Sequence, residues 1–284
     1  MPTSVDRVSE QRTAFVLGGG GVLGAVEVGM LRALLEAGIT PDLIVGTSIG
    51  ALNGALLATE PSLGVIERLE SLWRAAADSR EIYGEGPVAQ VRRAVRSRTH
   101  VYSAQPLRDR LEAELGGAHF EHLAVPFQCV ASSIERAAEH WFSTGPVAPA
   151  VMASAAVPGF FPPAEIEGEH YLDGGIVNSV PVGRAVELGA TEIYVLQVGR
   201  IERPLSVPTN PLDVARVSFE IARRHRFHRE IGNLPDGIRA WVLPTGSGSS
   251  RDDALTAFRS FEAVERRIEA SYAASRAFLL AREL

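Results

Sequence analysis

Short apolar runs alternate with longer amphipathic segments in the first part of the chain, and this alternation predicts a strand–helix–strand–helix order. Residues 13–17 and 42–45 are apolar runs of strand length, as expected for strands buried on both faces of a parallel sheet. Between them, residues 24–37 carry apolar side chains at helical spacing. Gly38 stands just beyond, where a helix C-terminus favours glycine. This order predicts an α/β fold in which neighbouring strands are parallel.

The remaining elements are predicted in the same way, from apolar runs of strand length and from apolar side chains at helical spacing. Further strands are expected at 127–132, 140–143, 170–172, 192–198 and 238–243, and further helices at 51–58, 148–156, 181–188, 210–231 and 254–284. Helical pieces also lie within 61–117, where the arginine-bearing stretch 79–105 is expected to be a mobile connection or lid. We expect a polar, frayed N-terminus at 1–12 and one domain over 13–284, with its helical C-terminal part at 211–284.

The composition is that of an ordinary globular protein, and it narrows the function classes. A net charge of −6 gives no reason to expect nucleic-acid binding. The single cysteine, Cys129, lies in an apolar run, so we expect a small buried hydrophobe and a reducing compartment. Four glycines and Glu27 interrupt the apolar stretch 14–35, which argues against a signal peptide or membrane anchor. The sequence therefore predicts a cytoplasmic protein.

Every basic side chain in the chain is arginine, because lysine is absent. A phosphate-binding loop of the Walker A type needs a lysine. A Schiff-base enzyme and a Ser-Lys dyad need one as well. These three chemistries are therefore excluded.

The segment 42–54 joins a predicted strand directly to a predicted helix through Gly46-Thr47-Ser48-Ile49-Gly50. Gly-x-Ser-x-Gly spacing removes the Cβ atoms that would collide in a sharp strand–helix turn, so Ser48 is expected to be exposed on a strained turn. Its place at a helix N-terminus would put the positive end of the helix dipole near developing negative charge. The same pattern also fits an ordinary strand–helix turn that Ser48 caps.

The glycine-rich loop after the first strand, residues 18–21, together with Gly24 at the start of the helix, allows two interpretations. Gly19, Gly21 and Gly24 satisfy the Gly-x-Gly-x-x-Gly spacing of dinucleotide sites. That site also needs an acidic residue at the end of the second strand, where this chain has the Ser48 turn instead. The loop is therefore better interpreted as a cluster of backbone N–H donors beside Ser48, suited to hold the oxyanion of an acyl-transfer reaction.

A serine nucleophile needs a base, and Asp173 is the favoured candidate. It ends a predicted strand and precedes Gly174 and Gly175, a turn that can hold a carboxylate at the same sheet edge. Because an ordinary aspartate has a pKa of ~3.9, a dyad would require desolvation to raise it. A routine Asp-Gly turn is the alternative. Seven histidines are present, but His225 and His228 lie in the arginine-rich run 223–229, which is expected to be a solvated helix face.

Three motifs, in this order, resemble the patatin-like phospholipase family. They are residues 17–24, 46–50 and 173–175, and the segment 153–163 resembles the stretch before the family's aspartate. The resemblance covers residues 13–200. It implies a three-layer α/β/α fold with a mostly parallel central sheet. It also implies an enzyme that hydrolyses acyl esters, chiefly of lipids, with no cofactor or metal.

Carried onto this chain, the resemblance implies Ser48 as the nucleophile and Asp173 as the general base of a Ser-Asp dyad. The implied oxyanion hole is Gly19, Gly20 and Gly21, and the glycines that support the motifs are Gly24, Gly46, Gly50, Gly174 and Gly175. One position departs from the pattern, since the family commonly has arginine or lysine where this chain has Leu23. That departure removes a charge that would assist at the oxyanion or recognise an acidic head group.

Two other functions stay open at this point. An α/β-hydrolase with a Ser-His-Asp triad would need His225 or His228 as its base, and it normally places several strands before the serine. A lipid- or protein-binding member of the fold with little catalysis is compatible with Leu23. The run 223–229 is also compatible with contact with an anionic membrane surface. The motifs specify neither the acyl chain and head group nor the oligomeric state.

Overall fold

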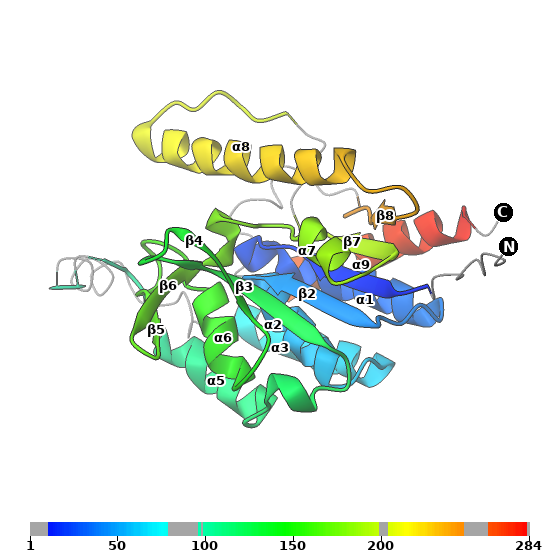
Figure 1. Ribbon diagram of the computed structural model, residues 1–284, viewed down its shortest axis with the longest axis horizontal. Helices are drawn as coiled ribbons and strands as arrows, with labels where there is room; N and C mark the ends of the chain where they lie inside the picture. Colours follow the sequence, from blue (N-terminus) through cyan, green and yellow to red (C-terminus); the bar gives the residue numbers. More distant parts are fainter. Residues whose placement is uncertain (1–10, 79–95, 98, 199–203, 247–260, 283–284) are drawn as a thin grey trace, which may run out of the picture.

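A computed structural model describes residues 11–78, 96–97, 99–198, 204–246 and 261–282. Within these ranges, one eight-stranded sheet has the order β5-β6-β3-β2-β1-β7-β8, with β4 also paired to β3 (Figure 1). The strands are β1 (Thr13–Leu17), β2 (Leu43–Thr47), β3 (Phe127–Ser133), β4 (Ala138–Phe142), β5 (Ala164–Ile166), β6 (Glu169–Asp173), β7 (Glu192–Leu196) and β8 (Arg239–Val242).

The sheet is parallel through β3, β2, β1, β7 and β8, and antiparallel where β4, β5 and β6 join it. The mostly parallel sheet is therefore confirmed. Strand β5 was not predicted, because three residues carry almost no periodic signal. It is held by pairing with β6 across a two-residue turn, in which Glu167 and Gly168 both have positive φ, as type I′ hairpin turns require.

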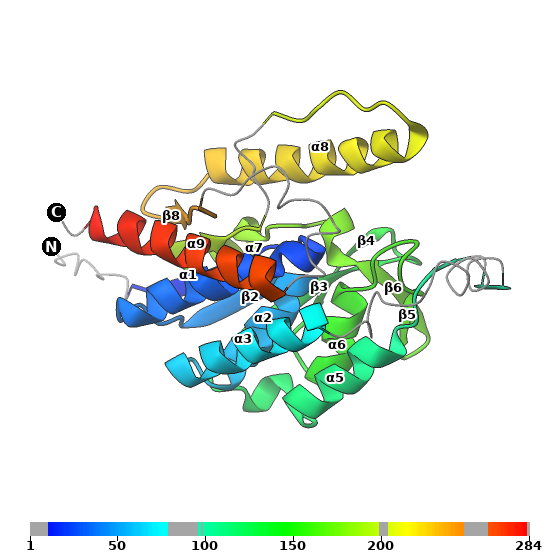
Figure 2. The same cartoon turned by 180° about the vertical axis from the view of Figure 1, so that it is seen from behind.

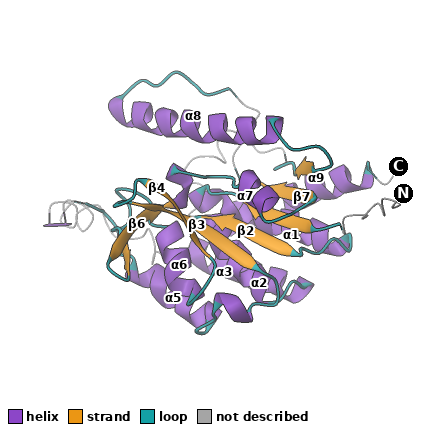
Figure 3. Ribbon diagram, in the orientation of Figure 1, coloured by secondary structure: helices purple, strands orange, loops and turns teal. Residues whose placement is uncertain are grey.

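Helices cover both faces of the sheet (Figure 3). The longer ones are α1 (Ala25–Glu36), α2 (Ile49–Thr59), α3 (Leu63–Asp78), α5 (Gln105–Leu115), α6 (Val147–Ser154), α7 (Val182–Glu187), α8 (Pro211–Gly232) and α9 (Phe261–Leu280). Single 3-10 turns are η1 (Gly21–Gly24), η2 (Phe120–His122) and η3 (Gly174–Ile176). Figure 2 shows α1, α2, α3, α5, α6 and α9 on one side, whereas α7 and α8 lie on the other.

Strand β1 shows why the arrangement has three layers. Phe15 and Leu17 belong to the core beneath α1 and α2, while Ala14 and Val16 belong to a second core beneath α7 and α8. Successive side chains of a strand point to opposite faces, so an all-apolar strand serves both cores. The three-layer α/β/α prediction is confirmed.

The C-terminal helical part divides between the two faces of the sheet. Helix α8 lies over the face that carries α7, whereas α9 packs along α1 on the opposite face. Gly29 permits this close packing, because a Cβ there would lie 2.1 Å from the Ile268 carbonyl oxygen. Residues 254–260 of the predicted last helix lie outside the described residues.

The predicted lid at 79–105 also lies largely outside the described residues. Its described end contacts the segment before β5: His100 bridges to Gly159, and the Tyr102 ring stacks on Phe160. Among the described helices, none combines the length and apolar character needed to cross a lipid bilayer.

Candidate active site

Two strands of opposite direction end side by side at the centre of the sheet. Strand β4 pairs with residues 129–133 along one edge of β3. On the other edge, β2 runs parallel until Thr47 pairs with Val130, and β6 runs antiparallel until Asp173 pairs with Ala131. The C-terminal ends of β2 and β6 therefore pair with consecutive residues of β3. Ser48, which follows β2, lies beside Asp173, the last residue of β6.

Ser48, the first residue after β2, adopts a strained backbone conformation with φ 55° and ψ −120°. A non-glycine residue with positive φ is uncommon and is found at sites where surrounding contacts hold it. Here the Ser48 N–H donates to Ser154 Oγ at 2.8 Å, and Ser154 Oγ in turn donates to the Val130 carbonyl at 2.6 Å. The alternative of a capping serine is wrong, because the Ser48 side chain makes no capping hydrogen bond to α2.

The glycines around Ser48 are required by close backbone approach. A Cβ on Gly46 would lie 2.7 Å from Ala51 Cα, and one on Gly50 would lie 2.4 Å from the Leu17 carbonyl oxygen. Both distances are far inside van der Waals contact. The steric prediction for the Gly-x-Ser-x-Gly turn is therefore confirmed, and the turn also brings α2 against the end of β1.

The Ser48 hydroxyl donates a hydrogen bond to the carboxylate of Asp173, with Oγ and Oδ2 2.5 Å apart. The other carboxylate oxygen, Oδ1, accepts from the Gly175 N–H at 2.7 Å. The Ser132 hydroxyl donates to the Asp173 backbone carbonyl at 2.8 Å and so fixes the strand end. Both Ser48 and Asp173 are buried, at 4% and 5% exposure, so the prediction that the serine turn leaves Ser48 exposed is wrong.

Burial raises the pKa of Asp173 to about 6, because the charged carboxylate loses its hydration. The hydrogen bonds from Ser48 and Gly175 and the positive charge of Arg223 act in the opposite direction and keep the pKa from rising further. The desolvation that a Ser-Asp dyad requires is present at Asp173. At pH 7 the group is mostly ionised, yet it is far more basic than an exposed aspartate.

The glycine loop lies beside Ser48, since a Cβ built on Gly19 would be 3.4 Å from Ser48 Cβ. Gly18 N–H donates to the Leu196 carbonyl, and Gly19 N–H donates to the Ser179 carbonyl at 2.8 Å. The Gly19 N–H is therefore not free to donate a hydrogen bond to an oxyanion. Among the described residues, the N–H groups of Gly20 and Gly21 have no such partner, which leaves these two as free donors.

The other predicted motif glycines permit close packing around this centre. A Cβ on Gly24 would lie 2.3 Å from Ile49 Cγ1, and one on Gly174 would lie 2.1 Å from the Val130 carbonyl oxygen. A Cβ on Gly175 would lie 2.9 Å from Asp173 Oδ1. Gly24 thus lets the glycine loop approach the residue that follows Ser48, while Gly174 and Gly175 let the aspartate turn lie against β3 and against the Asp173 carboxylate.

An apolar cavity opens at Ser48 and follows one face of α2 away from the sheet edge. Ile49, Leu52 and Leu56 form that face, which agrees with helical spacing. Leu72, Trp73, Leu107, Leu111 and Phe161 supply most of the opposite wall, while Arg110 and Glu114 lie among the lining residues of α5. Phe161 lines the cavity, whereas its neighbour Phe160 is 39% exposed.

No histidine in the described part of the chain is hydrogen-bonded to Ser48 or Asp173. His225 and His228, the only candidates for a triad base, lie exposed on α8, so the described residues provide no imidazole for a Ser-His-Asp triad. The described residues also contain no cluster of three or more His, Cys, Asp or Glu side chains arranged to hold a metal ion. Cys129 is fully buried, as predicted, and burial raises the pKa of its thiol.

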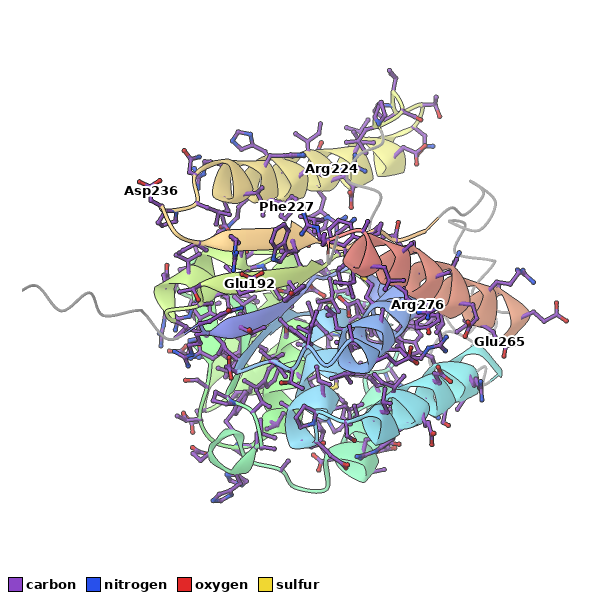
Figure 4. The ribbon with its side chains drawn as sticks, turned by 90° about the vertical axis from the view of Figure 1, so that its right-hand side faces the viewer. Glu192, Arg224, Phe227, Asp236, Glu265 and Arg276 are labelled. Carbon is purple, nitrogen blue, oxygen red and sulfur yellow. The ribbon has the colours of Figure 1, made fainter. Side chains whose placement is uncertain are left out.

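The prediction of a solvated helix face at 223–229 is wrong for Arg223, Arg226 and Phe227. Phe227 is buried and points toward the sheet (Figure 4), and Arg226 donates to the Val177 carbonyl at 2.6 Å. The Arg223 side chain is only 9% exposed and donates to the Gly19 carbonyl at 2.7 Å. Residues 223, 226, 227 and 230 recur at helical spacing, and the apolar Phe227 among them is the signal that could have revealed the inward face.

A family model described as Patatin-like phospholipase matches residues 15–186, more than half of the 284 residues. The chain belongs to the patatin-like phospholipase family. It is 33% identical over 204 residues to Lysophospholipase NTE1 of Coccidioides immitis (strain RS), and the aligned region covers 69% of this chain and 12% of that relative. It is 34% identical over 205 residues to Patatin-like phospholipase domain-containing protein ZK370.4 of Caenorhabditis elegans, covering 66% of this chain and 14% of that relative.

This patatin-like chain therefore spans only 12–14% of the length of those two curated relatives. Among solved structures, VipD from Legionella pneumophila aligns over 96% of this chain and 67% of its own, with 14% identity and a TM-score of 0.46. ExoU in its complex with SpcU, from Pseudomonas aeruginosa, aligns over 96% of this chain and 52% of its own, with 18% identity and a TM-score of 0.45.

Proposed function

We propose that this patatin-like protein is a serine acyl hydrolase that cleaves carboxylic esters of lipids, with Ser48 as nucleophile and Asp173 as general base. The observation that carries the proposal is the 2.5 Å contact between Ser48 Oγ and Asp173 Oδ2. A nucleophile within hydrogen-bond reach of a base that is itself held by a third group is the arrangement that covalent catalysis needs. Here the third group is the Gly175 N–H.

In the proposed reaction, ionised Asp173 accepts the proton of the Ser48 hydroxyl while Ser48 Oγ attacks the carbonyl carbon of the ester. The carbonyl oxygen gains negative charge and is held by the free N–H groups of Gly20 and Gly21, with help from the dipole at the N-terminus of α2. Protonated Asp173 then gives its proton to the departing alcohol. Water, deprotonated by the same carboxylate, releases the acyl group and regenerates Ser48.

The apolar cavity along α2 supports a substrate with a fatty acyl chain. It begins at Ser48 and contacts Ile49, Leu52 and Leu56, so a chain attached at the reacting carbonyl can follow the apolar face of the helix. Two similar relatives are named lysophospholipases. We therefore propose a lipid monoester or lysophospholipid as the substrate class, with one acyl chain occupying the cavity.

The test compares hydrolysis of a p-nitrophenyl acyl ester by wild-type protein, Ser48→Ala and Asp173→Asn. Both substitutions should reduce kcat by at least about a thousandfold, as loss of a nucleophile or its base does in serine hydrolases. Ser62→Ala and Asp109→Asn, on the surface away from Ser48, serve as matched controls and should keep wild-type rates. A fluorophosphonate probe should label wild-type protein but not Ser48→Ala. Full activity in either site variant would refute the dyad.

A further inference from the structure

One peptide group of the glycine loop, Gly19–Gly20, is held by a side chain from a distant helix. The Gly19 carbonyl oxygen accepts a hydrogen bond from Arg223 Nη1 at 2.7 Å. The same nitrogen lies 3.3 Å from Ser179 Oγ, while the Ser179 carbonyl accepts the Gly19 N–H. Gly19 is therefore bonded at both its N–H and its carbonyl, and the loop cannot rotate at this point without breaking one of these bonds.

The placement of Arg223 is costly in purely structural terms. Its side chain is 9% exposed, and Glu220, its carboxylate partner among the described residues, lies 3.2 Å from Nη2 on the same helix. Within the described residues, its buried Nε has no hydrogen-bond partner. Burying a guanidinium with an unsatisfied nitrogen opposes folding. Stabilisation of the fold therefore does not by itself account for an arginine at this buried position.

We infer that Arg223 is the positioning residue of the oxyanion hole, an inference that rests on the acyl-hydrolase function proposed above. In a trans peptide the C=O and the following N–H point in opposite directions. A donor that fixes the Gly19 carbonyl toward α8 therefore fixes the Gly20 N–H away from α8, as a free donor on the opposite side of the loop. Arg223 sets the direction of that donor before substrate arrives.

The charge of Arg223 acts through the same peptide. A cation that donates to a carbonyl polarises the peptide, and hydrogen bonds in such a chain strengthen one another. The Gly20 N–H becomes a stronger donor to an oxyanion than it would be in an isolated loop. The charge also reaches the base, since Arg223 lowers the pKa of Asp173. One side chain of α8 thus supports both the oxyanion donor and the carboxylate.

The test uses Arg223→Met, Arg223→Lys and, as a matched control on the same helix, the exposed Arg229→Met, assayed on a short soluble p-nitrophenyl ester. Arg223→Met should lower kcat about tenfold to a hundredfold with KM little changed, because the affected donor acts on the transition state. Its affinity for an alkyl trifluoromethyl ketone, whose serine adduct carries an oxyanion, should fall in parallel. Arg223→Lys should recover part of kcat, and Arg229→Met should match wild type.

A pH profile separates positioning from a structural tie between α8 and the loop. Removing the positive charge should move the acid limb of kcat/KM to higher pH in Arg223→Met, but not in Arg223→Lys. If thermal unfolding shows that Arg223→Met does not fold, Arg223→Lys serves as the test variant. A reduced kcat with an unchanged KM in Arg223→Lys would then support the inference. Wild-type kcat in the folded Arg223 variants overturns the inference alone. Absence of Ser48-dependent hydrolysis in the wild-type protein overturns the proposed function and the inference together.

Discussion

Ser48 and Asp173 are 125 residues apart in the chain, yet Oγ of the serine lies 2.5 Å from Oδ2 of the aspartate. They meet because β2 and β6 end opposite consecutive residues of β3, Val130 and Ala131. The contact is therefore a consequence of strand register. A slip of one residue in either pairing would turn the side chain to the other face of the sheet.

The raised pKa of Asp173 predicts an acid limb in the activity profile. Only the ionised carboxylate can accept the Ser48 proton, and its pKa is raised to about 6. We therefore expect kcat/KM to increase with pH through about 6 and to level off above it. Rates measured from pH 4.5 to 8.5 on a soluble ester test this. A limb centred near pH 4 would mean that burial does not act on this group as described.

The cavity along α2 predicts a preferred acyl length. From Ile49 to Leu56 the helix rises by about 11 Å, which matches a saturated chain of about eight to ten carbons. In a series of p-nitrophenyl esters, kcat/KM should be highest near that length. Leu56→Trp should move the optimum to shorter chains, because it fills the far end of the cavity. Its rate on the acetyl ester should match that of the wild-type protein, which would show that the dyad is intact. An unchanged optimum would place the acyl chain elsewhere.

Gly20 is sensitive to substitution for a steric reason. Its φ of 172° suits any residue, but a Cβ would lie 1.8 Å from Val198 Cγ2. Gly20→Ala should therefore displace the loop and reduce kcat by about a hundredfold, as loss of one oxyanion donor does. Val198→Ala alone should have little effect on kcat. The double variant should recover much of the lost rate, and a double variant no better than Gly20→Ala would contradict this explanation.

Glu27 predicts how stability depends on pH. This carboxyl is fully buried in α1, where Asn53 Nδ2 donates to it at 2.7 Å, and burial raises its pKa well above the ordinary value. Between the unfolded and folded pKa values the folded state binds more protons. The contribution of Glu27 to the free energy of unfolding should therefore fall as pH rises above about 4.5, by up to about 1.4 kcal/mol per pH unit.

Glu27→Gln should remove this contribution while keeping the shape of the side chain and its contact with Asn53. Its free energy of unfolding, measured in urea at several pH values, should fall less steeply with pH than that of the wild-type protein. Glu262→Gln, at an exposed position of α9, controls for the loss of one carboxylate. Equal slopes for wild type and Glu27→Gln would show that Glu27 is ionised in the folded protein.

Features governed by neighbouring residues could be predicted from the sequence. The strands predicted at 13–17 and 42–45, the helix that follows Ser48 and the close approaches at Gly46 and Gly50 depend on periodicity and on local sterics. Asp173 could be singled out because it ends a predicted strand and two glycines follow it. These features are specified by side chains a few positions apart, so they do not require knowledge of the rest of the fold.

Other features arise only from tertiary packing. The three residues of β5 form a strand because β6 pairs with them, and the Gly19 N–H is unavailable because it donates a hydrogen bond to the Ser179 carbonyl. Arg223 reaches the glycine loop because Phe227 turns that face of α8 toward the sheet. The pKa of Asp173 depends on burial by elements from the whole chain. The sequence by itself determined which groups could react, and the tertiary structure decided their distances, their desolvation and the cation beside them, because those quantities depend on contacts between residues far apart in the chain.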